Sequence, residues 1–173
     1  LTARSLGYAG TLSVPMNNSS KSGQTITLSA ISGFTLAAEK QETITPTEGG
    51  IVTNSNIGSS FKLNIPANAL GTGSNAGTVK TQANSAVPNP ASGSVLAKNA
   101  VSISAIDSSG QPVKNLNDNV TIVVPYTEAD IPAGTSETDL QLGVWNDSTQ
   151  TYDTLPTTVD TTNNTLTAMV SHF

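Results

Sequence analysis

Short runs of alternating apolar and polar residues, separated by turn-forming residues, constrain the fold of this chain more than any other feature. Alternation with a period of two is typical of half-buried antiparallel strands, and helical periodicity is nearly absent. We expect strands at residues 11–14, 25–30, 61–65, 101–105, 120–124, 140–145 and 166–170. The segments between them are rich in Asn, Asp, Ser, Thr and Gly, which favour turns. The sequence therefore predicts an all-β fold, an antiparallel β-sandwich.

The alternation lapses at two places that bear on domain organisation. It lapses first around residues 45–50, so residues 1–46 form either N-terminal strands or a small β appendage. A segment of about 46 residues is marginal for an independent core. We therefore expect it to pack on the main body, residues 47–173. The second lapse, residues 84–93, contains two prolines and predicts a surface loop.

Composition narrows the classes of function. The 173 residues include no cysteine, which excludes a disulfide framework, a thiolate metal site and a thiol nucleophile. The formal net charge is -5 and no basic run is present, so we expect no nucleic-acid partner. No window approaches the roughly 20 apolar residues of a membrane helix, so we expect no membrane span.

Only 11% of residues are charged, and side chains with hydroxyl or amide groups outnumber the charged ones. This composition is typical of secreted bacterial and archaeal proteins and predicts an extracellular or cell-surface location. The chain begins at Leu1 without the apolar core of a signal peptide and stops at Phe173. We therefore expect it to be a fragment of a longer, exported protein.

Few catalytic constellations are available. The chain has one histidine, His172, which excludes a multi-histidine metal site and restricts a Ser-His-Asp triad to its surroundings. The acidic residues around Pro132-Ala133-Gly134 match no calcium-loop spacing, and a solvated acidic loop is the favoured interpretation. They are Glu128, Asp130, Glu137 and Asp139. Trp145 and Tyr152 flank a turn, where they form either an aromatic platform for carbohydrate or a core plug, which is the commoner role.

Strand parity predicts where His172 lies. In an extended strand Leu166, Ala168, Val170 and His172 share one face, so His172 continues an apolar row. An imidazole on that face is desolvated, and desolvation favours the neutral form that a general base requires. From parity alone, a packed histidine without a catalytic role remains the stronger interpretation.

A resemblance changes that balance. The stretches Gly49-Gly50-Ile51-Val52 and 61–70 (FKLNIPANAL), then 119–126, 140–146 and 159–173, together resemble ZU-five-type domains in their microbial surface-protein form. In several members of that group the last strand carries His-Phe-Ser, and the chain breaks between Phe and Ser. On this resemblance His172 matches the histidine and Phe173 supplies the scissile carbonyl. The serine would follow Phe173, and an end at Phe173 is what either a completed cut or a designed boundary would leave.

The resemblance implies intramolecular autoproteolysis after Phe173 by a serine N-to-O acyl shift, in a single turnover and without a cofactor. His172 would take the serine proton or protonate the departing amine. The C-terminal fragment, beginning with Ser, would remain bound as a non-covalent strand. Two alternatives stay open: a non-catalytic structural or adhesive β module, and a carbohydrate-binding module.

Overall fold

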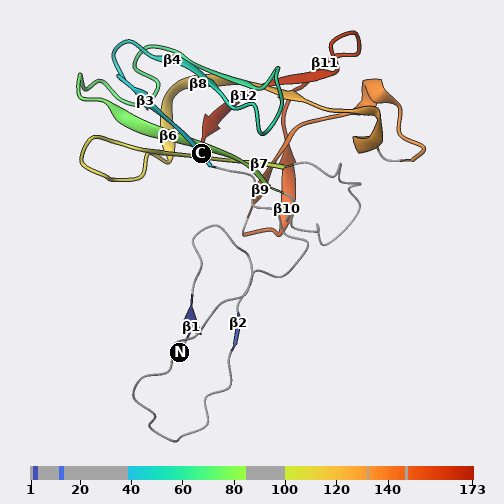
Figure 1. Cartoon of the computed structure of the whole chain (residues 1–173), viewed down its shortest axis with the longest axis horizontal. Helices are drawn as coiled ribbons and strands as arrows, with labels where there is room; N and C mark the ends of the chain where they lie inside the picture. Colours follow the sequence, from blue (N-terminus) through green and yellow to red (C-terminus); the bar gives the residue numbers. More distant parts are fainter. Residues whose placement is uncertain (1, 4–11, 14–38, 85–99, 132, 147) are drawn as a thin grey trace, which may run out of the picture. The chain divides into compact units, whose positions relative to one another are not determined.

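The computed structural model describes residues 2–3, 12–13, 39–84, 100–131, 133–146 and 148–173 (Figure 1). The chain divides into two compact units, Leu1–Leu36 and Ala37–Phe173. In the smaller unit, β1 (Thr2–Ala3) pairs antiparallel with β2 (Leu12–Ser13). The strand predicted at residues 25–30 and nearly all of the loop predicted at 84–93 lie outside the described residues.

The larger unit is all-β and antiparallel, which confirms the predicted fold class. Its strands are β3 (Lys40–Ile44), β4 (Gly50–Thr53), β5 (Lys62–Ile65), β6 (Gly77–Asn84), β7 (Ala100–Ile106), β8 (Asn115–Pro125), β9 (Gly143–Asn146), β10 (Thr151–Thr154), β11 (Thr158–Asp160) and β12 (Thr165–His172). In the described part of this unit they form a five-stranded sheet ordered β11-β12-β8-β5-β4, a three-stranded sheet ordered β3-β6-β7, and the β9-β10 hairpin. Two single 3₁₀ turns, η1 (Glu128–Asp130) and η2 (Glu137–Asp139), follow β8. The described residues contain no helix long and apolar enough to cross a membrane.

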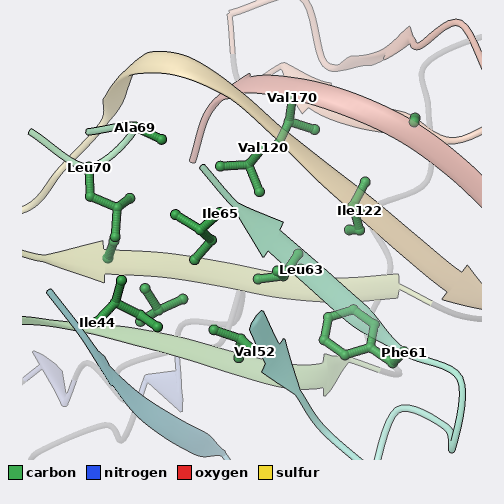
Figure 2. Close-up of a cluster of buried hydrophobic side chains, with 13 residues drawn as sticks. Ile44, Val52, Phe61, Leu63, Ile65, Ala69, Leu70, Val120, Ile122 and Val170 are labelled. Atoms are coloured by element: carbon green, nitrogen blue, oxygen red, sulfur yellow. The ribbon is translucent and has the colours of Figure 1, made fainter. Parts of the chain in front are cut away.

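The core lies between the inward faces of the five-stranded and three-stranded sheets (Figure 2). Leu63 and Ile65 alternate with exposed Lys62 and Asn64 along β5, as a half-buried strand requires. The other sheet contributes one buried apolar residue from each of its strands, namely Ile44, Val79 and Ala105. Full burial of a side chain such as Phe61 or Leu63 contributes about 1.5–3 kcal/mol, so this layer is the main source of stability.

Strand β3, which lies within the residues 1–46 expected to form N-terminal strands or a small β appendage, belongs to the larger unit. It pairs with β6 from Lys40↔Thr81 to Ile44↔Gly77. The sequence conceals this strand because only Ile44 of its five residues is apolar. In this edge strand the partly buried positions before Ile44 hold the charged residues Lys40 and Glu42. A pattern of alternating apolar residues therefore does not detect the strand.

A tight turn carries the chain from the three-stranded to the five-stranded sheet. The Thr45 carbonyl accepts hydrogen bonds from the amides of Glu48 and Gly49, both at 3.0 Å. Gly49 has φ +68°, and a Cβ there would lie 2.3 Å from the Ile65 carbonyl oxygen. Only glycine fits this position, because it accepts positive φ and leaves room for the neighbouring backbone.

A buried polar contact joins the two sheets. Asn54, just after β4, donates from Nδ2 to the Thr81 carbonyl oxygen at 3.0 Å and lies 3.1 Å from Thr81 Oγ1. Its Oδ1 accepts the Asn56 amide at 3.0 Å. Both Asn54 and Thr81 are fully buried, so the Asn54 amide nitrogen and the Thr81 hydroxyl need partners within the protein. The pair fixes how β4 stands against β6.

Replacing Asn54 should therefore destabilise the fold measurably. Asn54→Ala leaves the Thr81 carbonyl oxygen buried without this donor, and the expected cost is about 1–3 kcal/mol in the free energy of unfolding, measured in urea. Ser55→Ala, at the exposed neighbouring position, is the control and should change that free energy by less than about 0.5 kcal/mol. Equal effects of the two variants would contradict a stabilising role for the cross-sheet contact.

Candidate functional site

The candidate site lies at the end of β12, where its pairing with β8 becomes irregular. From Thr165↔Pro125 to Val170↔Val120 the two strands are in regular antiparallel register. The next pair is His172↔Asn115, so one residue of β12, Ser171, faces four residues of β8, residues 116–119. This bulge ends the strict alternation that governs the rest of the strand.

The bulge makes the sequence-based placement of His172 wrong. Leu166, Ala168 and Val170 are buried as predicted, but His172 is exposed. The parity argument assumed a regular ladder up to the last residue, and the extra residues in β8 break that assumption. The imidazole therefore does not lie among the buried apolar side chains, and the ring is accessible to any group that approaches from solvent.

Phe173 is the anchored residue of the pair. Its ring is partly buried and packs against the core cluster. Its amide donates to the Lys114 carbonyl oxygen at 3.0 Å, which extends the pairing with β8 by one residue. The backbone that leads to the Phe173 carbonyl is thus held both by a hydrogen bond and by packing.

Ser171 and Asn115 are described neighbours of the imidazole. Nδ1 of His172 lies 3.5 Å from Ser171 Oγ, and Asn115 stands opposite in the sheet. Such an arrangement allows His172 to accept or donate a proton at an exposed position, but the described residues hold no group of three or more His, Cys, Asp or Glu side chains that could bind a metal ion. Sequence reasoning missed Lys114 and Asn115, because their proximity to His172 follows only from the register of β8.

Two of the four acidic residues predicted to form a loop, Asp130 and Glu137, accept local side-chain hydrogen bonds. Asp130 Oδ2 accepts the Thr127 amide at 2.9 Å and the Thr127 hydroxyl at 2.7 Å, which closes η1. Tyr126 Oη donates to Glu137 Oε1 at 2.5 Å and so ties η2 back to the end of β8. Burial of the phenol, followed by this contact with Glu137, raises the pKa of Tyr126 to about 12.

Trp145 and Tyr152 are direct cross-strand partners in the β9-β10 hairpin. Their ring centroids lie 5.0 Å apart with an interplanar angle of 62°, an edge-to-face contact. Both rings are half-buried. They do not form one flat platform, so their geometry favours packing within the hairpin over stacking on a sugar ring.

Comparisons of this chain with protein-family models, with curated proteins and with solved structures found no match. The resemblance to ZU-five-type domains therefore stays a prediction.

The Tyr126 contact should make stability depend on alkaline pH. The unfolded phenol ionises near pH 10 and the folded one at about 12, so the folded state retains the proton over this interval. The contribution of protonated Tyr126 to the free energy of unfolding is therefore complete below pH 10 and is lost as pH rises to about 12. Urea unfolding at pH 8 and pH 11 should show a larger loss for the wild type than for Tyr126→Phe. Equal losses in the two proteins would refute this coupling.

Proposed function

We propose that this domain cleaves its own backbone after Phe173 when a serine follows, as part of a secreted or cell-surface protein. The observation that carries the proposal is the end of β12: Phe173 is fixed by its bond to Lys114 and by the core, while the adjacent imidazole is exposed. A backbone held at Phe173 beside an accessible imidazole suits intramolecular attack by a neighbouring hydroxyl. The sequence pair His172-Phe173 and its resemblance to self-cleaving domains add support.

The reaction has two steps. The serine Oγ bonds to the Phe173 carbonyl carbon as its proton passes to His172, the amide C–N bond breaks, and the nitrogen takes that proton. The product is an ester between Phe173 and the serine hydroxyl, with a free amine. Water then hydrolyses the ester to a Phe173 carboxylate and restores the hydroxyl. Each molecule reacts once, and no cofactor takes part.

The sheet supplies positioning. An ordinary amide is planar and resists such a shift. In the proposed reaction the hydrogen bond and packing at Phe173 hold its backbone, so a distortion of the scissile bond would not relax through this residue. Folding of the sandwich is then the trigger, because only the folded strand presents the carbonyl in this way.

A chain extended beyond Phe173 with serine at the next position should split after Phe173 without added protease. The reaction is intramolecular, so its rate should not depend on protein concentration. Intact mass spectrometry on dilution series checks both points. A rate that falls on further purification or with protease inhibitors would reject self-cleavage, and a chain that stays whole would favour a structural or adhesive module.

His172→Ala and replacement of the serine after Phe173 by alanine should both reduce the rate of cleavage, but to different extents. His172→Ala removes positioned proton transfer and should slow the cut by about 10²–10⁴-fold. A slow residual reaction should remain, because the held Phe173 and the serine are still present. Loss of the nucleophile should abolish the cut. Intact mass over days measures both rates, with circular dichroism to show that each variant is folded. Cleavage of His172→Ala at the wild-type rate would show that the imidazole has no role in the reaction.

A further inference from the structure

Asn115 lies directly opposite His172 where β8 pairs with the end of β12. The Phe173 amide donates to the Lys114 carbonyl oxygen at 3.0 Å, which places these two residues at a hydrogen-bonded position of the ladder. In an antiparallel ladder the next pair is not hydrogen-bonded, its Cα atoms are about 4.5 Å apart, and its side chains approach most closely. That next pair is His172 and Asn115.

The side chains of Asn115 and His172 share the outer face of the sheet. Leu116 and Phe173 pack against the core cluster, so the residues that precede them point to the opposite face. Both Asn115 and His172 are exposed, as this placement requires. Directly opposite residues of an antiparallel pair have Cβ atoms about 4.5–5.5 Å apart. Rotation of the two side chains is therefore enough to bring the Asn115 amide to a ring nitrogen of His172.

The Asn115 side chain is available for such a contact. In the described part of the chain its amide group is engaged in no hydrogen bond. Other exposed or half-buried asparagines are already committed, since Asn146 Nδ2 donates to Asp153 at 2.9 Å and Asn163 Nδ2 donates to Asp160 at 2.7 Å. Local turns explain those contacts, whereas a turn does not account for Asn115, which stands within a strand.

The imidazole needs a partner if it is to act as a proton acceptor in one orientation. A neutral imidazole accepts a proton at one ring nitrogen while the other nitrogen carries the hydrogen, and the hydrogen bond made by that second nitrogen selects the tautomer. Ser171 Oγ lies 3.5 Å from His172 Nδ1, at the outer limit of a hydrogen bond, so it holds the ring only weakly. The side-chain oxygen of Asn115 can accept the ring N–H instead.

We propose that Asn115 is a positioning residue for self-cleavage: its side-chain oxygen accepts a hydrogen bond from one ring nitrogen of His172 and leaves the other nitrogen to take the serine proton. The role rests on the proposed function, but the contact itself needs only residues of this chain. One hydrogen bond of this kind changes a rate by about 2–10-fold. Loss of Asn115 should therefore slow the cut less than loss of the imidazole.

The tautomer of His172 tests the contact without any cleavage. The chain ending at Phe173 has one histidine, so ¹⁵N labelling of histidine gives a single pair of ring signals in long-range NMR correlation spectra. At about pH 9, where an ordinary imidazole is neutral, one tautomer should predominate in the wild type. Asn115→Ala should move the tautomer ratio at least about threefold toward that of a histidine in a short peptide.

A matched control lies on the same strand. Asn117 is exposed like Asn115 but has no partner on β12 in the register of the two strands. Asn117→Ala should leave the tautomer ratio of His172 unchanged. Asn115→Asp keeps a side-chain oxygen at the same place and should retain the wild-type tautomer, which a merely structural role of Asn115 would not predict.

The cleavage rate tests the positioning role. In the chain extended past Phe173 with serine at the next position, Asn115→Ala should cut about 2–10-fold more slowly than the wild type. Asn117→Ala should cut at the wild-type rate. Intact mass spectrometry measures the rates, and circular dichroism shows that each variant is folded.

The outcomes separate this inference from the proposed function. An unchanged tautomer ratio in Asn115→Ala, or equal effects of Asn115→Ala and Asn117→Ala, would overturn the contact. Cleavage of Asn115→Ala at the wild-type rate would overturn the positioning role, even where the wild type cleaves itself. A changed tautomer ratio in a protein whose extended wild type stays whole would support the contact but reject self-cleavage, and the positioning role with it.

Discussion

Burial of one face of each sheet against the other is the constraint on which the rest of this structure depends. Without cysteine or a described metal cluster, the larger unit relies on this apolar layer for its stability. The residues in it come from strands far apart in sequence, such as Val52 on β4, Val79 on β6 and Val120 on β8. Each strand can bury one side chain in two, which sets the alternation along β5 and β12.

Polar groups within this layer must be satisfied, and the way they are satisfied fixes the relation between the sheets. Asn54 and Thr81 are the described buried side chains that link one sheet to the other by hydrogen bonds. Gly49 allows the chain to cross between the sheets close to the Ile65 backbone. Apolar contacts tolerate small shifts between the sheets. The Asn54–Thr81 contact and the turn at Gly49 do not, so they determine one arrangement of the two sheets.

The end of β12 shows how a local irregularity in strand pairing changes which side chain faces solvent. The four β8 residues opposite Ser171 release the strand from its alternation, so that the imidazole faces solvent and the following phenylalanine packs on the core. An anchored Phe173 beside an exposed imidazole is the arrangement on which the proposed self-cleavage rests. In the proposed reaction the base must meet a hydroxyl from the next residue, and an exposed ring has the freedom to do so.

The sequence by itself determined the fold class and the strands whose apolar residues alternate clearly, such as β5, β8 and β12. It did not reveal β3, whose alternation rests on charges, or β6, where buried Thr81 takes a place that an apolar residue would mark. It identified His172 and Phe173 as a pair but misplaced the imidazole. Only the tertiary structure decided which of the two packs on the core and which backbone groups hold them, because their partners on the other strand, Asn115 and Lys114, lie more than fifty positions earlier in the chain. Periodicity is a local property, whereas a bulge and a sheet edge exist only once strands are paired.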